Sequence, residues 1–216
     1  MFAAMVAGTF IYGLGNWKTA LIVLAFFITS AAISGKWKIQ SPDLPNKARR
    51  NGLQVWANGF WLLICLILVS LFDQNIFLIG ALASIATATA DTWGTELGSN
   101  KTSATYLITT FENVKPGDDG GISFRGTIAA VGGSAMIAAL SVYFFSLQFY
   151  IFLCILIAGF LGSVADSYFG AIFQKNNSSI AVPFSRVKIQ IDNNLVNGLA
   201  TGCGALLAII LKLLLS

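Results

Sequence analysis

The sequence contains no histidine, few charged residues and only three cysteines. The absence of histidine excludes a Ser-His-Asp triad, a Cys-His pair and any zinc site with imidazole ligands. The cysteines lie in apolar runs without CxxC spacing, which indicates small core residues rather than disulfides or metal ligands. Metal binding and proton transfer are therefore left to nine acidic side chains, and phosphate binding to thirteen basic side chains and the backbone.

The shortage of charge also indicates the class of protein. Charged residues make up 10% of the 216 residues and apolar residues 56%, and the mean hydropathy is +0.77. A soluble domain of this size is usually about 25% charged. This composition excludes an ordinary cytosolic enzyme, a disordered tail and a secreted disulfide scaffold. It predicts a polytopic membrane protein.

Apolar runs alternate with polar segments along the whole chain. A membrane-crossing helix needs roughly 20 mostly apolar residues, and every run except the first is long enough. We therefore predict an all-α fold, a polytopic transmembrane helix bundle with six full helices plus a short N-terminal one, in a single integral membrane domain over residues 1–216. The short run is expected to be a re-entrant or truncated helix. The runs are residues 1–14, 17–34, 52–72, 75–97, 124–146, 148–172 and 193–215.

Long basic loops alternate with very short turns between these runs. The loops at 35–51, 98–125 and 173–191 contain eleven of the thirteen basic residues. Only Lys18 and Lys212 fall on the opposite side. Because positive residues accumulate in cytoplasmic loops, all three long loops are predicted to be cytoplasmic.

Three acidic residues, Asp91, Glu96 and Asp166, interrupt otherwise apolar helices. A charge inside a bilayer is costly and points to a function by default. At a rise of about 1.5 Å per residue, all three lie toward the cytoplasmic ends of their helices, so we expect them to meet near the inner membrane surface. Such a cluster suits Mg²⁺, which prefers oxygen ligands. A proton or cation pathway in a transporter or flippase, and a structural role as buried hydrogen-bond partners, remain alternatives.

The segments around Asp91 and Asp166 resemble each other. They read Ala-Asp-Thr-Trp and Ala-Asp-Ser-Tyr, and the two aspartates are 75 residues apart. Both helices are predicted to run from outside to inside. The similarity predicts a parallel internal repeat of two-helix units, and a pseudo-two-fold axis along the membrane normal would bring the two aspartates together.

A glycine-rich loop precedes the helix predicted at 124–146. Glycines allow positive φ, so backbone N–H groups can converge on an anion, and a helix N-terminus adds the positive end of its dipole. Ser123 is predicted to cap the helix, and Arg125 follows it. Asp118 and Asp119 would repel phosphate unless a cation intervenes, which favours Mg²⁺. A simple capped turn is the alternative explanation. The glycines concerned are Gly117, Gly120 and Gly121.

Polar amides enter two further helices at the same predicted depth as the carboxylates. Gln54 and Asn58 are four residues apart and share a helix face. Asp192, Asn193 and Asn197 fall roughly on one face of the last helix. Hydrogen bonds between helices are one explanation for such amides. Their predicted depth adds them to the candidate site.

Taken together, these motifs resemble the integral membrane family of phytyl-phosphate kinases and transmembrane protein 19. The match follows the order of the chain and covers nearly all of it. The residues that carry it are Arg50, Gln54, Val55, Ala57, Asn58, Gly59, Ala90, Asp91, Thr92, Trp93, Glu96, Gly98, Gly117, Gly120, Gly121, Ser123, Gly126, Gly162, Ser163, Asp166, Ser167, Gly170, Ala171, Asp192, Asn193, Asn194, Val196 and Asn197.

The resemblance implies a membrane kinase of tocopherol biosynthesis that transfers phosphate from CTP to an isoprenoid monophosphate, such as phytyl phosphate. Its partners would be a lipid phosphate and a nucleotide, with Mg²⁺ as cofactor and no nucleic acid polymer. Such an acceptor is already an anionic nucleophile, so the reaction is compatible with the absence of histidine. The implied Mg²⁺ ligands are Asp91, Glu96 and Asp166. The implied phosphate-neutralising residues are Arg49, Arg50 and Arg125. The implied nucleotide cradle is Gly117, Gly120, Gly121 and Ser123. The implied polar shell is Asn58, Asp192, Asn193 and Asn197.

Overall fold

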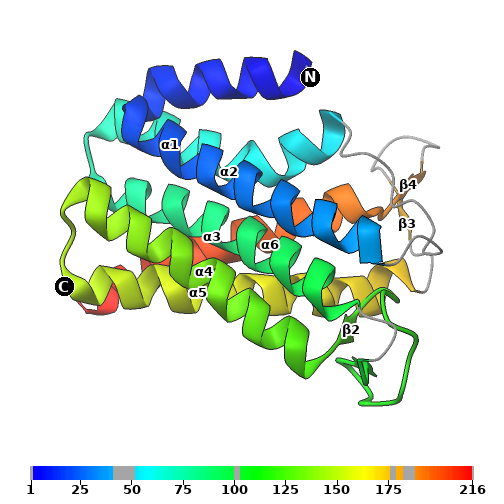
Figure 1. Ribbon diagram of the computed structural model, residues 1–216. Coiled ribbons are helices and arrows are strands. Elements are labelled where there is room, and N and C mark those ends of the chain that lie inside the picture. The colour runs from blue at the N-terminus through cyan, green and yellow to red at the C-terminus, as the bar shows by residue number, and fades with distance from the viewer. Residues whose placement is uncertain (1, 41–51, 100–102, 176–178, 182–187, 216) are drawn as a thin grey trace.

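Long helices dominate the computed structural model, which describes residues 2–40, 52–99, 103–175, 179–181 and 188–215. The described helices form one bundle, with small β-ladders at one end of it (Figure 1). The helices are α1 (Phe2–Gln40), α2 (Gly52–Phe72), α3 (Asn75–Gly98), α4 (Phe124–Phe145), α5 (Phe149–Phe169), the π-helix η1 (Gly170–Gln174) and α6 (Asn193–Leu214). The strands are β1 (Tyr106–Leu107), β2 (Gly121–Ile122), β3 (Ser179–Ala181) and β4 (Lys188–Gln190).

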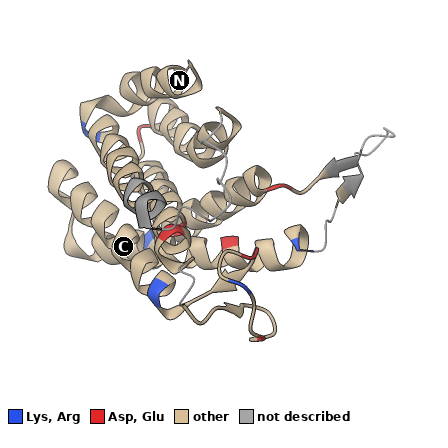
Figure 2. Cartoon of the chain, turned by 45° about the vertical axis from the view of Figure 1, so that its right-hand side comes forward, with Lys and Arg blue, Asp and Glu red and all other residues tan. Residues whose placement is uncertain are grey.

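Six of the described helices are long and apolar enough to cross a membrane. Most of the helical ribbon carries charge of neither sign (Figure 2). The chain is therefore an integral, multi-pass membrane protein, as the sequence predicts, and the helix bounds agree with the apolar runs to within a few residues for most helices. The short strand pairs β1–β2 and β3–β4 are additions that the sequence analysis did not predict.

The predicted short first helix is the N-terminal part of α1. The helix breaks at Asn16, whose backbone has φ 63° and ψ −179°. Asparagine tolerates positive φ better than most residues. Its side chain also accepts a hydrogen bond from the Lys18 N–H at 2.9 Å, which satisfies a donor at the start of the second part. One residue thus both breaks the helix and caps its continuation.

Three helices finish and three begin at one end of the bundle, which we call the loop end. There α1, α3 and α5 finish, and α2, α4 and α6 begin (Figure 1). The short α2–α3 and α4–α5 turns lie at the opposite end. The predicted alternation of long loops and short turns is confirmed. That the loop end faces the cytoplasm stays a prediction.

The middle of the bundle is occupied by α3, which contacts every other α-helix. Its residues are buried without interruption over 78–90. The Thr87 hydroxyl donates to the Ala83 carbonyl at 3.0 Å, so this polar side chain is satisfied within its own helix. A side chain at Gly162 on α5 or Gly204 on α6 would collide with Thr87. Small residues thus let backbones approach closely, which is how membrane helices commonly pack.

The helix α4 packs on α3 from its first turn to Gly133, where a Cβ would lie 3.1 Å from the Thr89 carbonyl oxygen. Near the loop end α4 packs on α3, where a Cβ at Gly98 would lie 3.0 Å from Gly126 Cα. Farther from the loop end it contacts α5, where the Ser134 hydroxyl donates to the Leu156 carbonyl at 2.8 Å. Glycines allow the close contact with α3, and a hydrogen bond supports the contact with α5.

Candidate functional site

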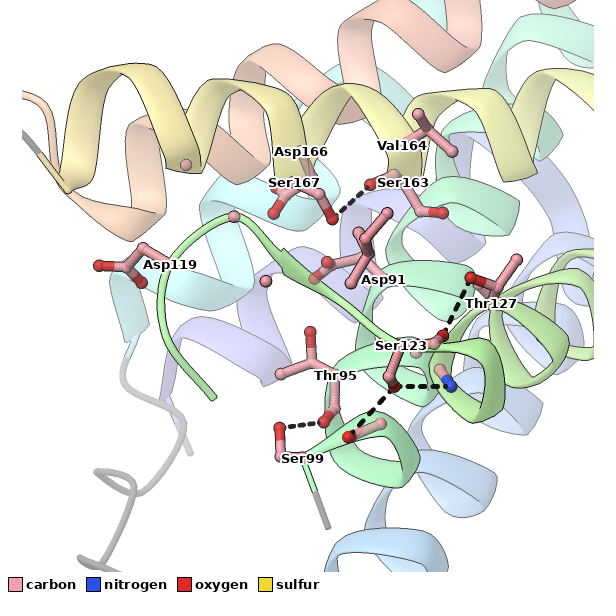
Figure 3. A pocket seen from close by; sticks show the side chains of 18 of the residues that line it. Asp91, Thr95, Ser99, Asp119, Ser123, Thr127, Ser163, Val164, Asp166 and Ser167 are labelled. Carbon is pink, nitrogen blue, oxygen red and sulfur yellow. Dashed lines mark hydrogen bonds between the residues drawn. The ribbon is translucent and has the colours of Figure 1, made fainter. Parts of the chain in front are cut away.

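A cavity of about 140 Å³ opens at the loop end, between α3, α4, α5, the start of α6 and the glycine-rich loop. Asp91 from α3 and Asp166 from α5 both line it (Figure 3). At about 10 to 15 Å³ for each water molecule, this space accommodates roughly ten waters. The room suits a hydrated cation and one or two phosphate groups.

The two aspartates lie close together in this cavity. Asp166 is within side-chain hydrogen-bonding reach of Asp91, and Asp119 of the glycine-rich loop is near enough to act on it electrostatically. Like charges at such short range repel strongly in a partly buried site. A bound cation would remove that repulsion. The close approach agrees with the predicted meeting of Asp91 and Asp166, while the internal repeat itself stays a prediction.

The start of α6 supports Asp166 from the side. With its amide nitrogen facing the carboxylate, Asn197 donates to Asp166 Oδ1 at 3.0 Å and to the Asn193 carbonyl at 3.1 Å. Asn193 also lines the cavity. Asp192 is exposed and caps α6, because its side chain accepts a hydrogen bond from the Leu195 N–H at 3.0 Å. The structure therefore brings two of these predicted residues to the site and gives Asp192 a capping role.

The glycine-rich loop, residues 117–121, covers one side of the cavity. Gly117 and Gly120 have φ of 93° and 77°, so the predicted positive φ is confirmed at both positions. A side chain at Gly120 would collide with Ala171, and a Cβ at Gly170 would lie 3.2 Å from the Gly120 nitrogen. The loop backbone thus rests directly on η1. Gly121 lines the cavity next to it and belongs to β2.

The first turn of α4 borders the cavity as well. Ser123 caps the helix, as predicted, by accepting a hydrogen bond from the Gly126 N–H at 3.2 Å. Its hydroxyl also donates to the Gly98 carbonyl at 3.2 Å, which ties the start of α4 to the end of α3. The positive end of the α4 dipole therefore lies beside the aspartates, in a position that favours an anion.

Several hydroxyl groups line the cavity without having been assigned from the sequence. Thr95 and Ser99 follow Asp91 at intervals of four residues along α3, and Ser163 and Ser167 lie on α5. Side chains four residues apart share one helix face. The spacing of four from Asp91 was thus the signal in the sequence for Thr95 and Ser99, whereas Ser167 directly follows Asp166 and has no such signal. The hydroxyls of Ser99, Ser163 and Ser167 donate to backbone carbonyls of their own helices, and their oxygens can accept hydrogen bonds from water.

Two predicted residues lie near the cavity without lining it. Glu96 comes five residues after Asp91 on α3, which places it about 140° around the helix, and it is not among the lining residues. Arg125 is exposed in the first turn of α4, next to the cap residue Ser123. The structure therefore does not bring the Glu96 carboxylate to the aspartate pair.

Other predicted residues lie elsewhere or outside the described part. Asn58 lines a second, apolar cavity of about 40 Å³ between α1, α2 and α3, which shares no lining residue with the first. Arg49 and Arg50 lie outside the described residues. The proposed neutralisation of phosphate by these arginines stays a prediction.

The acidic residues could also form a metal centre. Within the described ranges, no three His, Cys, Asp or Glu side chains gather in a way that would hold a metal ion. A complete protein cage for a metal is therefore absent from this part of the chain. Mg²⁺ is usually bound through one or two carboxylates, with waters and substrate phosphates completing its shell. The pair Asp91 and Asp166 fits that coordination, provided that a phosphate is bound too.

Several known proteins similar to this chain are described as membrane or chloroplastic proteins. The family model described as integral membrane protein DUF92 matches residues 1–205. An uncharacterized membrane protein of Methanocaldococcus jannaschii is 32% identical, over 91% of this chain and 77% of its own length. An uncharacterized membrane protein of Synechocystis is 27% identical, over 95% and 78%. The chloroplastic protein VTE6 of Arabidopsis thaliana is 25% identical, over 97% and 65%. No solved structure matches the chain significantly.

Proposed function

The chain belongs to the integral membrane protein DUF92 family, and from that premise we propose that it is a CTP-dependent, membrane-bound lipid-phosphate kinase. It transfers a phosphoryl group to an isoprenoid monophosphate such as phytyl phosphate, with Mg²⁺ as cofactor. The observation that carries the proposal is the pair Asp91 and Asp166 beneath a glycine-rich loop. The motif resemblance to phytyl-phosphate kinases supports the choice of substrate.

The donor groups of the cavity fit Mg²⁺ with a phosphate substrate. Asp91 and Asp166 would hold the ion, because hard oxygen donors are the ligands it prefers. Asn197 donates to Asp166 and so orients its carboxylate. When bound, Mg²⁺ neutralises charge on the nucleotide phosphates and on the leaving group. The chain's own part is to fix the two carboxylates on helices that pack against each other.

The opposite wall of the cavity suits phosphate. Gly117, Gly120 and Gly121 present backbone rather than side chains, and the first turn of α4 places the positive end of its dipole at the same wall. Asn193 adds a side-chain donor. These groups would hold the nucleotide phosphates, while Asp119 on the same loop favours a site with a cation between it and the phosphates.

The transfer itself needs positioning and charge neutralisation more than proton chemistry. An oxygen of the acceptor phosphate attacks the γ-phosphorus of CTP. The bond from that phosphorus to the β–γ bridging oxygen breaks, and CDP leaves with the electron pair. No proton has to be removed from an ionised acceptor oxygen, so a chain without histidine can support this reaction.

The depth of the site suits a lipid substrate. Asp91 is seven residues before the end of α3 at Gly98, which corresponds to about 10 Å along the helix. The phosphate of a lipid can reach this level while its chain stays in the hydrocarbon layer, where each CH₂ gains about 0.8 kcal/mol. The cavity opens at the loop end rather than at the bundle centre, which favours an enzyme over a transporter.

A transfer assay tests the proposal. The full chain in detergent is given Mg²⁺, γ-labelled CTP or ATP, and either phytol or phytyl phosphate. We expect label in phytyl diphosphate, with CTP as the better donor, and loss of label on chelation and in Asp91→Asn. Label with phytol alone would reassign the protein to the alcohol kinases. No transfer by folded protein, together with cation-dependent transport in vesicles, would contradict the kinase and favour a transporter that uses these aspartates.

A further inference from the structure

The lining of the phosphate cavity changes from polar to apolar with distance from the loop end. On each of three helices, the lining residue farthest from the loop end is apolar: Ala90 on α3, Ala130 on α4 and Phe160 on α5. Closer to the loop end the lining is mostly carboxylate, hydroxyl, amide and glycine groups, with Val164 and Ile122 as apolar additions. A molecule that fills the whole cavity is therefore charged at one end and apolar at the other.

The apolar end of the cavity lies between α4 and α5. These helices touch where the Ser134 hydroxyl donates to the Leu156 carbonyl. One turn closer to the loop end, Ala130 on α4 and Phe160 on α5 both line the cavity, and one turn beyond that Val164 does so too. Inner-facing residues of both helices thus border open space where contact between the helices would otherwise continue. The two helices diverge toward the loop end.

The loop-end turns of α4 pack closely on α3. A Cβ at Gly94 would lie 3.3 Å from the Ala130 Cβ, and a Cβ at Gly126 would lie 2.9 Å from the Gly94 carbonyl oxygen. Without side chains at these glycines, the first turns of α4 lie against α3 and away from α5. In Figure 1, α4 and α5 cross near their middles, and their ribbons lie apart at the loop end as well as at the opposite end.

Figure 3 shows where the gap lies relative to the charged groups. Thr127 on α4 and Val164 on α5 lie on one side of the cavity, and Asp119 lies on the opposite side. Asp91 and Asp166 lie between them. The order along the cavity is thus loop carboxylate, aspartate pair, then the gap between the two helices.

We propose that the hydrocarbon chain of the lipid phosphate leaves the cavity sideways, between the loop-end halves of α4 and α5 and past Ala130, Phe160 and Val164. This inference rests on the proposed function, since it gives that site its lipid. The rest of the chain then lies among the bilayer lipids, because both helices cross the membrane. Only the part of the lipid chain nearest the phosphate is recognised by the protein, and Val164 and Phe160 set the fit there.

Photolabelling tests this path without requiring turnover. The full chain in phosphatidylcholine nanodiscs receives a C20 isoprenyl monophosphate with a diazirine in the first third of its hydrocarbon chain. We expect adducts at 127–130 and 160–164 that an excess of unlabelled C20 monophosphate suppresses. Adducts confined to the α1–α2 cavity around Asn58, or no suppressible adducts, would overturn the proposal. If the gap is labelled but the protein transfers no phosphate, the kinase activity is refuted and the path of the lipid chain stands. If the protein transfers phosphate but the label lies elsewhere, the path is refuted and the kinase activity stands.

Two variants narrow the gap from opposite sides. In Val164→Phe and Thr127→Phe, we expect the preference for C20 over C5 monophosphate, measured by displacement of the photoprobe, to fall at least tenfold. Loss of about two buried methylene groups corresponds to roughly that factor. Val131→Phe and Ile157→Phe are matched controls on the same helices, 39% and 43% exposed and outside the lining, and they keep the preference. A preference within twofold of wild type in both folded test variants would overturn the path.

Discussion

Replacing Asp166 with asparagine removes one of two facing charges and keeps the shape of the side chain. Two carboxylates within hydrogen-bonding reach cannot both stay charged without a cation between them, because like charges repel strongly in a partly buried site. In Asp166→Asn, Oδ1 still accepts from Asn197, so the α5–α6 contact is retained. The variant should therefore fold and, without divalent cations, unfold at no lower a temperature than wild type.

The same substitution removes one of the two carboxylates proposed to bind Mg²⁺. A ligand at 100 times its Kd stabilises the folded state by about 2.7 kcal/mol, which raises Tm by about 5 to 10 °C in a chain of this length. Thermal unfolding in detergent, with EDTA or with saturating Mg²⁺, measures this gain. We expect wild type to show it and Asp166→Asn to lose most of it.

A matched control separates this effect from a general loss of negative charge. Asp73 is exposed at the end of the bundle opposite the loop end and has φ 50°, which asparagine also tolerates. Asp73→Asn should keep the full Mg²⁺ response. An undiminished response in Asp166→Asn would refute the assignment of Asp166 as a ligand, whatever the activity of the variant.

Three further substitutions test other parts of the site. Gly120→Ala puts a side chain at a position with positive φ, where it would collide with Ala171. We therefore expect this variant to bind CTP at least tenfold more weakly, as measured by thermal shift. Gly132→Ala is the control and should bind CTP as wild type does, because a Cβ there meets only Trp93 at 3.9 Å. Glu96→Gln should keep the Mg²⁺-dependent rise in Tm, because Glu96 does not line the cavity, and loss of that rise would return it to the ligand set. Asp192→Ala should lower the free energy of unfolding by about 1 kcal/mol through loss of the α6 cap, measured by denaturant unfolding in detergent, and an unchanged value would contradict the capping role.

The positions of the helices in the sequence could be predicted because the bilayer restricts which segments can cross it. A spanning segment has to satisfy its backbone internally and expose apolar side chains, so long apolar runs mark the helices. The caps were readable for a similar local reason. Ser123 directly precedes a helix, and its side chain finds a donor in the first turn, at the N–H of Gly126. Such features depend on residues a few positions apart.

The membership of the site depended on which face of each helix turns inward. Asp91 and Glu96 lie on one helix, but a separation of five residues sends them in different directions, and only Asp91 lines the cavity. Counting in steps of four from Asp91 would have favoured Thr95 over Glu96. The position of Asn58 could not be predicted from spacing within its own helix. It lines the apolar cavity because α2 packs there against α1 and α3.

The position of the cavity at the loop end has a consequence for the supply of substrate. A cavity that opens at one end of a bundle meets the lipids of one leaflet only. A lipid phosphate in the other leaflet has to cross the bilayer before it can react, and its charged head group makes that crossing slow. The product carries more charge than the substrate, so it is held more firmly in the leaflet where it forms. The enzyme proposed here would therefore act on one face of its membrane and enrich that face in its product.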